Sequence, residues 1–582
     1  MSDAQTDKQS PPDRPTPQKP LQVWPGVVAA ALQILCMFIL PAVVPGAFVF
    51  GLLGGLVGAL AVVVWWAFFS RATRVERWGA VALMLVAVVA MRPVIHKSIA
   101  GAGMGIMFPV YGLMSMSVAL VVGAAVGRRL SVGRRRAVLA ASILLACGAW
   151  ALVRTGGITG DADSDLAWRW SQTPEERLLA RAGDEPSARQ SAPASAETGA
   201  DWPGFRGPGR DGVVRGVRIA TDWKASPPVE LWRRPVGPGW SSFAVRGGRL
   251  YTQEQRGEHE VVACYDAATG EPGWAHRDAA RVYESNGGAG PRATPTLSGG
   301  RVYTFGATGI LNALDARDGS VVWSRNAAAD TGTKVPGWGF ASSPLVVGDA
   351  VVVAAAGTLA AYDAATGEPR WFGPKGGGGY SSPHRVTIDG VEQIVLMCGP
   401  GVVSVAPSDG RVLWQHALSS NGRIVQPAHI ADGDLLVSEG EGSYMYRIAV
   451  ARGGGGWKVE ERWMSEGLKP YFNDFVVHEG HAYGLDNGAL ACIDLKDGAR
   501  RWDGGSYGSG QLVLLPEQDV LLVVSEQGEL SLVGAAPERF AEMARFPAVK
   551  GKTWNHPVLA GDVLLVRNGE EMAAFRLPLQ GR

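Results

Sequence analysis

The chain has 582 residues, 78 glycines, 20 tryptophans and a formal net charge of +1. The near-zero charge argues against nucleic-acid binding, because affinity for a phosphate backbone needs many clustered lysines and arginines. Five cysteines without a Cys-x-x-Cys pair indicate neither a zinc site nor a disulfide framework. At this length, and with apolar residues unevenly spread, we expect at least two regions.

The N-terminal third is predicted to be a membrane region. A polar, proline-rich stretch predicts a disordered cytoplasmic tail over residues 1–23. Residues 24–153 are almost continuously apolar and predict about five transmembrane helices, at roughly 24–44, 46–69, 79–95, 104–126 and 137–153. A cleaved signal peptide would explain the first segment alone. Ionisable residues are nearly absent from the segment centres, so we expect an anchor and not a transporter.

Arginines between the apolar segments predict the orientation of the chain. Arg71, Arg74 and Arg77 follow the second segment, and a denser group follows the fourth: Arg128, Arg129, Arg134, Arg135 and Arg136. Loops rich in arginine stay in the cytoplasm. With five crossings, we expect a multi-pass protein of the inner (cytoplasmic) membrane whose chain after residue 154 lies in the periplasm.

Two irregular stretches follow the membrane region. Residues 154–200 contain a short amphipathic run at 174–181 and are then rich in Ala, Ser, Glu and Pro, which predicts a linker with one possible helix. Residues 201–229 are dense in Gly, Pro and aromatic residues. We expect them to form a lead-in segment that packs against the following domain.

Residues 301–326 contain the unit that repeats through the rest of the chain. Strands are predicted at 302–305, 311–315 and 321–323, joined by turns at Gly309 and at Asp318-Gly319. A ribbon of three strands cannot bury its own apolar face, so the unit must recur. Tryptophans do recur 39 to 49 residues apart, at 232, 274, 323, 371, 414, 463 and 502. This is the spacing of four-stranded propeller blades.

The ends of the repeat region predict the number of blades. Six blades end at tryptophans 274 to 502, and residues 511–546 form a seventh that lacks the tryptophan. Residues 556–577 supply three strands of an eighth, and residues 230–233 supply its missing outer strand. We therefore predict an all-β eight-bladed propeller over residues 230–578, with the ring closed so that no sheet edge is open. Trp323 should pack between neighbouring blades, and Cys264 and Cys492 should be small core residues.

The repeated strand, Gly-x-Leu-x-Ala-x-Asp run, glycine turn and tryptophan resemble the pyrroloquinoline-quinone (PQQ) repeat family. That family includes the quinoprotein alcohol dehydrogenases and the propeller lipoprotein of the outer-membrane β-barrel assembly machinery. The sequence WPGFRGPGRDG at residues 202–212 is similar to the leader found before many such propellers. The resemblance implies the architecture, whereas function depends on sites carried by the fold.

The connections that enter the innermost strand of each blade are the predicted ligand-binding region. The resemblance implies that they converge on one mouth of the central channel, the face that carries the quinone in the dehydrogenases. Serines there are expected to start the inner strands. The remaining polar and aromatic residues are predicted to line a funnel: Trp240, Arg292, Trp338, Tyr380, Arg423, Gln426, Tyr471, Asn473, Asp474, Tyr507, Trp554, Asn555 and His556.

Two functions from different classes follow. A PQQ- and calcium-dependent alcohol dehydrogenase would need a calcium set of carboxylate and amide ligands. The chain has no Cys-Cys pair, and Asn473-Asp474 is the main candidate, with Glu254 and Asp278 as further possible ligands. A hydrolase is not favoured, and His384 is expected to be an inner-strand residue and not a base. We therefore expect a non-catalytic scaffold without a cofactor, which binds a protein or envelope polymer in the bacterial cell envelope. The dehydrogenase is the alternative, and it gains if Asn473, Asp474 and another carboxylate meet.

Overall fold

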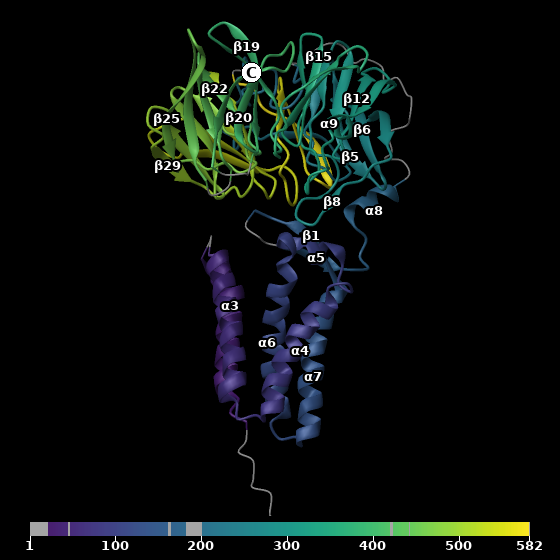
Figure 1. The fold of residues 1–582 in the computed structure, drawn as a ribbon, viewed down its shortest axis with the longest axis vertical. Helices are drawn as coiled ribbons and strands as arrows, with labels where there is room; N and C mark the ends of the chain where they lie inside the picture. The colour runs from purple at the N-terminus through teal and green to yellow at the C-terminus, as the bar shows by residue number, and fades with distance from the viewer. Residues whose placement is uncertain are drawn as a thin grey trace, which may run out of the picture. The chain divides into compact units, whose positions relative to one another are not determined.

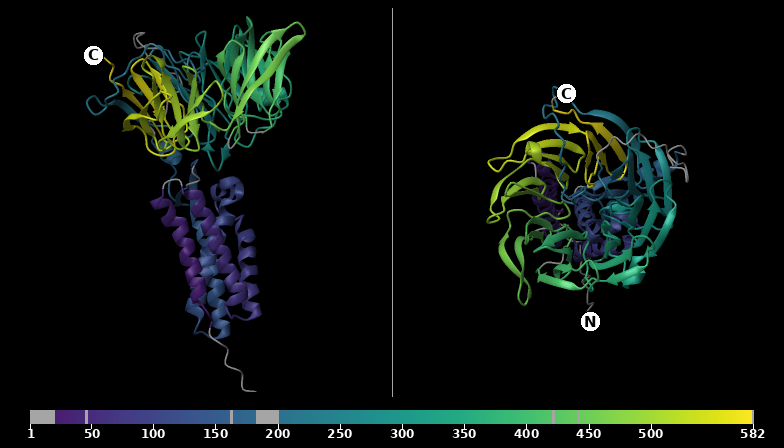
Figure 2. Two further views of the ribbon diagram at one scale, coloured as in Figure 1. Left: turned by 90° about the vertical axis from the view of Figure 1, so that its left-hand side faces the viewer. Right: turned by 90° about the horizontal axis from the view of Figure 1, so that it is seen from above.

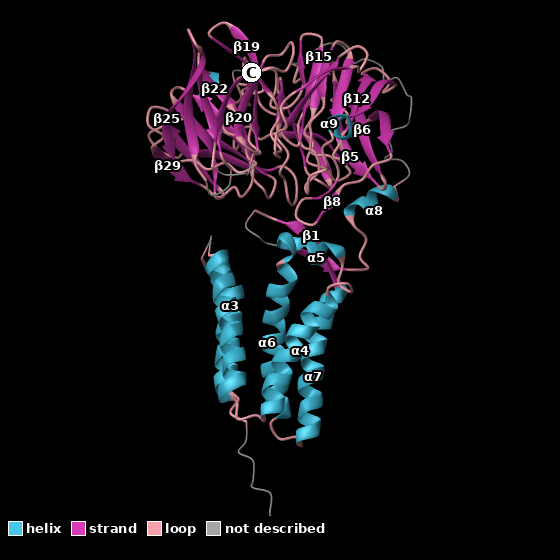
Figure 3. Ribbon diagram, in the orientation of Figure 1, coloured by secondary structure: helices cyan, strands magenta, loops and turns pink. Residues whose placement is uncertain are grey.

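The computed structural model describes residues 21–44, 47–160, 164–181, 201–419, 423–440 and 443–580. Most of the predicted tail (1–20) and of the predicted linker (182–200) lie outside these ranges. The chain divides into two compact units, Met1–Thr155 with Leu166–Arg169, and Gly156–Asp165 with Trp170–Arg582. Helices dominate the first unit and strands the second (Figure 3).

The first unit is a bundle of helices (Figure 1). Its elements are α1 (Trp24–Ile34), η1 (Leu35–Ile39), α2 (Leu40–Val43), α3 (Phe48–Val64), η2 (Trp65–Phe69), α4 (Arg74–Met91), α5 (Lys97–Gly101), η3 (Ala102–Gly105), α6 (Met107–Gly127), α7 (Val132–Gly148) and η4 (Ala149–Leu152). Four described segments are long and apolar enough to cross a membrane: Trp24–Val43, Phe48–Phe69, Met107–Gly127 and Val132–Leu152. The predicted span at 79–95 overlaps α4, which is not one of these four segments. The first turn of α4 contains three charged residues, Arg74, Glu76 and Arg77.

Small residues and a few polar contacts hold this bundle together. Gly51, Gly55 and Gly58 are buried along α3, and a Cβ atom at Gly58 would lie 2.6 Å from the Cβ of Gln33 in α1. Such stripes of small residues let helix backbones approach closely. At the arginine-rich loops, Arg135 donates two hydrogen bonds of 2.8 Å to the buried carboxylate of Glu76. Arg135, one of the arginines used to predict orientation, therefore forms an ion pair inside the helical bundle.

The second unit is a ring of blades around a central channel (Figure 2). Blade one is β4 (Ala244–Arg246), β5 (Arg249–Arg256), β6 (His259–Asp266) and β7 (Pro272–Asp278); blade two is β10 (Thr296–Ser298), β11 (Arg301–Phe305), β12 (Ile310–Asp315) and β13 (Val321–Asn326). Blade three is β14 (Leu345–Val347), β15 (Ala350–Ala355), β16 (Thr358–Asp363) and β17 (Pro369–Phe372); blade four is β18 (His384–Ile388), β19 (Val391–Cys398), β20 (Gly401–Val405) and β21 (Val412–Ala417).

The remaining blades complete the ring. Blade five is β22 (Ala428–Ala431), β23 (Asp434–Ser438), β24 (Met445–Gly453) and β25 (Gly456–Ser465); blade six is β26 (Val476–His478), β27 (His481–Asp486), β28 (Ala489–Asp494) and β29 (Arg500–Gly504). Blade seven is β30 (Gln511–Leu515), β31 (Val520–Val524), β32 (Glu529–Gly534) and β33 (Glu542–Pro547); blade eight is β34 (Val558–Ala560), β35 (Val563–Arg567), β36 (Glu571–Arg576) and β3 (Val229–Pro235). The other elements are β1 (Val153–Ile158), β2 (Ser164–Trp168), α8 (Pro174–Leu179), β8 (Tyr283–Glu284), β9 (Gly288–Ala289), α9 (Ala327–Thr331) and η5 (Pro516–Gln518).

The blade count and the closure of the ring are confirmed. Within the described residues there are eight four-stranded sheets, and the last has the order β3-β36-β35-β34. Strand β3 pairs antiparallel with β36, with Trp232 opposite Ala574. The first and last strands of the repeat region thus share one blade, as the residue pattern predicted. All five cysteines lie in described ranges and are unpaired, and Cys264 and Cys492 are fully buried.

The recurring tryptophan packs against the next blade. Trp323 is 7% exposed, and its Nε1 donates to the carbonyl of Ala364 in blade three at 3.0 Å. Trp274 and Trp502 make the corresponding bond to Ala316 and Ala536. The turn glycine lies against the ring of the preceding blade's tryptophan: a Cβ atom at Gly367 would lie 2.6 Å from Trp323 Cδ2. The glycine and tryptophan of the repeat therefore form one contact between blades, as expected for Trp323.

Substituting Gly367 tests this contact. Gly367 has φ +76° and faces Trp323, whereas Gly348 in the same blade has φ +58° and a Cβ atom there would have no neighbour within 4 Å. Gly348→Ala should cost about 1–2 kcal/mol of unfolding free energy from the left-handed backbone alone. Gly367→Ala should cost about 1–3 kcal/mol more, because the ring must shift. Chemical denaturation followed by tryptophan fluorescence measures both; equal losses would contradict the contact.

Candidate functional site

A belt of hydrogen bonds joins the starts of the inner strands. The backbone N–H of Ser242 donates to Thr294 Oγ1 at 3.0 Å, and that of Thr294 donates to Ser343 Oγ at 3.0 Å. Ser343 N–H in turn donates to Ser382 Oγ at 2.9 Å. The backbone N–H of Gln426 donates to Asp474 Oδ1 at 3.4 Å in the same way. These hydroxyls and the carboxylate therefore link one blade to the next, which agrees with the structural role predicted for the serines.

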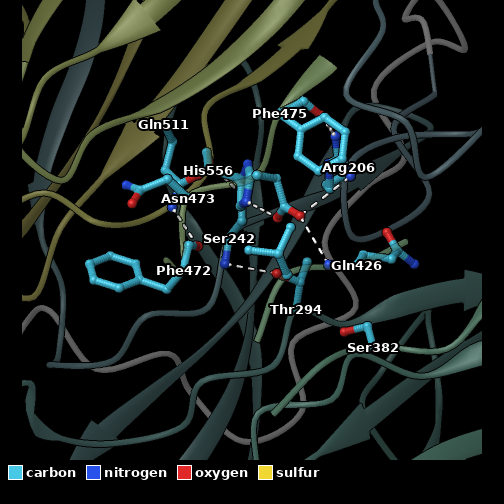
Figure 4. A network of polar contacts seen from close by, with 12 residues as sticks. Arg206, Ser242, Thr294, Ser382, Gln426, Phe472, Asn473, Phe475, Gln511 and His556 are labelled. Carbon is cyan, nitrogen blue, oxygen red and sulfur yellow. Dashed lines mark hydrogen bonds and ion pairs between the residues drawn. The ribbon is translucent and has the colours of Figure 1, made fainter. Parts of the chain in front are cut away.

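Arg206, Gln426 and His556 lie close together at one part of this belt (Figure 4), and each of them contacts Asp474. Asp474 is 5% exposed, and its Oδ2 lies 3.0 Å from His556 Nε2, while its Oδ1 lies 3.4 Å from Arg206 Nη1. Burial acts to raise the pKa of Asp474, but the charge of Arg206 and the bond to His556 outweigh it, and the pKa is lowered. The carboxylate is thus ionised and held inside the ring by its own partners.

The lead-in segment supplies the arginines that meet this carboxylate. Trp202 pairs with Val245 of blade one, and Val213 pairs with Leu514 of blade seven. Arg206 also donates to the Phe475 carbonyl at 2.5 Å, and Arg210 donates to the Pro344 carbonyl at 2.9 Å. These carbonyls come just after the belt residues in the sequence, whereas the predicted aromatic residues Trp240, Trp338 and Tyr380 come just before them. The lead-in therefore contacts blades one, three, six and seven through residues that lie beside the belt.

Six aromatic rings pack against one another at the mouth. Trp240 stacks on Trp554 with centroids 4.7 Å apart, and Trp554 contacts Phe472 at 4.9 Å. The series continues through Tyr471, Trp338 and Tyr380, with separations of 5.4, 6.3 and 5.1 Å. Connections from blades far apart in the sequence thus meet. The resulting surface, which we call the aromatic mouth, consists of Trp240, Trp338, Tyr380, Tyr471, Phe472 and Trp554.

Charged side chains lie among these rings. Lys552 Nζ is 4.4 Å from the centroid of Trp554 and 5.2 Å from that of Trp240, a cation–π arrangement. Burial lowers the pKa of Lys552 to about 8, although nearby Glu284 acts in the opposite direction. Glu526 Oε1 accepts from Trp554 Nε1 at 2.7 Å. The sequence analysis did not identify Lys552, Glu284 or Glu526 as site residues, although Lys552 lies two residues before Trp554 in the same connection.

The other predicted site residues divide into three groups. Arg292 lies at the mouth, where its guanidinium donates to the carbonyls of Trp338 and Gly288. Asn473 and Asn555 are buried in the inner wall and donate to backbone carbonyls, as Gln426 does. Two residues lie elsewhere: Tyr507, in the core between blades six and seven, and Arg423, buried beside the Cys398 carbonyl. His384 begins the inner strand β18, as expected.

The residues present do not fit a calcium-bound quinone. The oxygens of Asp474 face Arg206 and His556, and Glu254 accepts from Arg256, Tyr265 and the Gly237 N–H. Asp278 accepts from Asn312 at 2.7 Å. Among the described residues, His478, Glu479 and Asp519 form the one group of three or more close metal-ligating side chains, and it excludes all three candidates. At the mouth, directly stacked rings such as Trp240 and Trp554 leave no space between them for another ring.

A separate cavity lies between blades three and four. Its volume is about 280 Å³, and its lining includes Leu359, Lys375, Cys398 and His416. No predicted site residue lines it. Most of the predicted funnel residues lie instead in the aromatic mouth and in the inner wall, with Tyr507 and Arg423 as the exceptions.

This architecture defines an eight-bladed propeller built from PQQ-type repeats. A family model described as outer membrane protein assembly factor BamB matches residues 223–374 and 258–504, which confirms the resemblance to the PQQ-repeat family. The BamB protein of Shewanella oneidensis is 30% identical over 156 residues, covering 25% of this chain and 36% of that protein. The BamB protein of Yersinia pestis is 24% identical over 365 residues, covering 58% of this chain and 86% of that protein.

Solved structures also resemble the chain in fold. The quinohemoprotein alcohol dehydrogenase from Comamonas testosteroni has a TM-score of 0.49 and 14% identity, covering 70% of this chain and 85% of that one. The match to the first BamB protein spans about a third of that relative's length.

Proposed function

We propose that the chain is a membrane-anchored, extracytoplasmic β-propeller that acts as a non-catalytic scaffold for a protein of the bacterial cell envelope. The observation that carries this proposal is the bonding of Asp474 and His556. The residues best suited to chemistry are engaged with each other and with Arg206, deep in the ring. The rigid disc around them offers broad faces for a partner. Relatives named outer membrane protein assembly factors support a protein partner.

The helical unit supports the anchor. Four helical segments have the length and composition of membrane spans, and α4 packs beside α6 and α7 with 18 residues, enough for a fifth crossing. Five crossings place the chain after residue 154 on the side opposite the arginine-rich loops. We propose an inner-membrane, multi-pass protein with the propeller in the periplasm.

Quinone binding decides between the scaffold and the dehydrogenase. Purified full-length protein in detergent would be titrated with PQQ and calcium, and alcohol oxidation would be assayed with an artificial electron acceptor. We expect no stoichiometric quinone binding and no turnover, because the groups that would hold calcium are engaged internally. Stoichiometric binding with turnover would overturn the scaffold proposal.

Depletion in the native host tests the positive half of the proposal. A scaffold for envelope assembly should, when depleted, reduce the amount of folded outer-membrane proteins, measured by heat-modifiable migration on gels. Depletion followed by re-expression of the Gly455→Leu variant, altered in the exposed turn between β24 and β25, should restore the level. Unchanged outer-membrane proteins on depletion would contradict a role in assembly.

A further inference from the structure

Five residues that precede the propeller in sequence contact Lys552 and Glu526, the charged residues that lie among the rings of the aromatic mouth. We call Gly156–Gly160 the docked segment; it belongs to the same compact unit as the blades. The N–H of Gly160 donates to Glu526 Oε1 at 2.7 Å, and that of Ile158 donates to the Asn286 carbonyl at 3.2 Å. The Ile158 carbonyl accepts from Lys552 Nζ at 3.5 Å. The docked segment is thus held mainly through its own backbone N–H and carbonyl groups.

The groups that hold the docked segment are the charged residues of the mouth. Lys552 also donates to the Asn286 carbonyl at 2.7 Å, and its ammonium lies against the rings of Trp240 and Trp554. Glu526 also accepts from the Ser509 N–H at 3.1 Å. A cation that donates to carbonyls and a carboxylate that accepts N–H groups, placed beside flat rings, form a surface suited to a peptide backbone.

Glycine is required where the docked segment meets this surface. Gly157 has φ +138°, and a Cβ atom there would lie 2.2 Å from Lys552 Nζ and 2.7 Å from the Asn286 carbonyl oxygen. A Cβ atom at Gly160 would lie 2.0 Å from Ser509 Oγ. A side chain at Gly157 would therefore meet the backbone carbonyl of Asn286, and one at Gly160 would force Ser509 to move.

A second contact keeps the docked segment close to the mouth. Glu175 in α8 forms a two-pronged ion pair with Arg281, at 2.7 and 2.9 Å, and accepts from the Gly257 N–H at 2.9 Å. Leu178 of the same helix is 2% exposed. This anchoring raises the effective concentration of the docked segment at the mouth, on the order of millimolar for a short connection.

We propose that the aromatic mouth is a binding site for extended, glycine-containing peptide backbone, and that Gly156–Gly160 occupies it in cis. The inference rests on the proposed scaffold function and names the class of ligand. A partner loop with an extended, glycine-containing backbone binds by displacing the docked segment. The docked segment therefore regulates access to the aromatic mouth.

Hydrogen exchange on full-length protein in detergent tests the self-occupancy. Gly160→Leu should displace the docked segment, and exchange of the amides of Ile158 and Gly160 should accelerate by tenfold or more. Acylation of Lys552 by an amine-reactive reagent at pH 8 should rise several-fold in the same variant. Gly455→Leu is the matched control, because a Cβ atom there has no neighbour within 4 Å. Wild-type exchange and acylation in Gly160→Leu would overturn the proposal.

A synthetic peptide tests whether the mouth binds backbone in trans. The capped peptide Gly-Gly-Ile-Thr-Gly, at millimolar concentration, should restore protection of residues 550–556 in Gly160→Leu and have little effect on wild type. A peptide with leucine in place of its last glycine should not. Failure of the first peptide in the variant would overturn binding in trans. If either test fails while depletion still lowers folded outer-membrane proteins, the inference fails and the scaffold function stands.

Discussion

Replacing Asp474 with alanine is expected to lower the free energy of unfolding of the propeller by about 3–5 kcal/mol. Arg206, 4% exposed, would keep its buried charge without the carboxylate that faces it at 3.4 Å. His556 Nε2 and the Gln426 N–H would also lose their acceptor. The loss arises because a buried charge without a partner costs more than the intact pair contributes.

Equilibrium denaturation followed by tryptophan fluorescence measures this effect. The matched control is Glu392→Ala, which breaks an ion pair with Arg385 at 3.5 Å in which both side chains are about half exposed. Exposed pairs contribute about 0–1 kcal/mol, so the control should change little. The double variant Arg206→Met with Asp474→Leu removes both charges and should lose less than Asp474→Ala. A loss below about 1 kcal/mol in Asp474→Ala would contradict the assigned role.

Glu260→Gln is expected to stabilise the propeller at pH 8 and to have little effect near pH 5. Glu260 is 4% exposed and lies between blades one and two. Burial raises the pKa of Glu260 to about 7, although the hydrogen bond that its carboxylate accepts from the Ala307 N–H acts to lower the pKa. An acid whose pKa is raised in the folded state contributes stability below its unfolded pKa of 4.5 and loses it as pH rises through 7. At about 1.36 kcal/mol per pKa unit, the loss is about 3 kcal/mol.

Unfolding midpoints of both forms between pH 5 and pH 8 measure this dependence. Wild type should lose stability across the window relative to Glu260→Gln. Glu254→Gln in the same blade is the control with the opposite sign: burial acts to raise the pKa of Glu254, but Arg256 and Arg567 outweigh it and lower the pKa. Glu254→Gln should therefore destabilise at pH 8. Parallel pH profiles for wild type and Glu260→Gln would contradict the raised pKa.

The amino-acid sequence by itself determined the ring. A glycine that must adopt positive φ and a tryptophan that must be buried recur together, as at Gly367 and Trp323, because each blade needs the next one to cover its ring. The same local pattern predicted that residues 230–233 complete blade eight, since a closed ring leaves no unpaired edge. The long apolar helices of the helical unit could also be predicted from sequence, because the length and the apolar composition of each segment are properties of that segment alone.

Only the tertiary structure decided what the polar residues of the channel do. Asp474 was predicted to line a funnel, but its partners come from blade eight and from the lead-in, at His556 and Arg206. Tyr507 was placed in the same funnel by its position in the repeat, yet its ring fills the core between two blades. Lys552 contacts the docked segment, although the two are far apart in the sequence. Periodicity follows from contacts that most blades repeat, whereas the charge pairs join residues that occur once, so no repeat pattern encodes them.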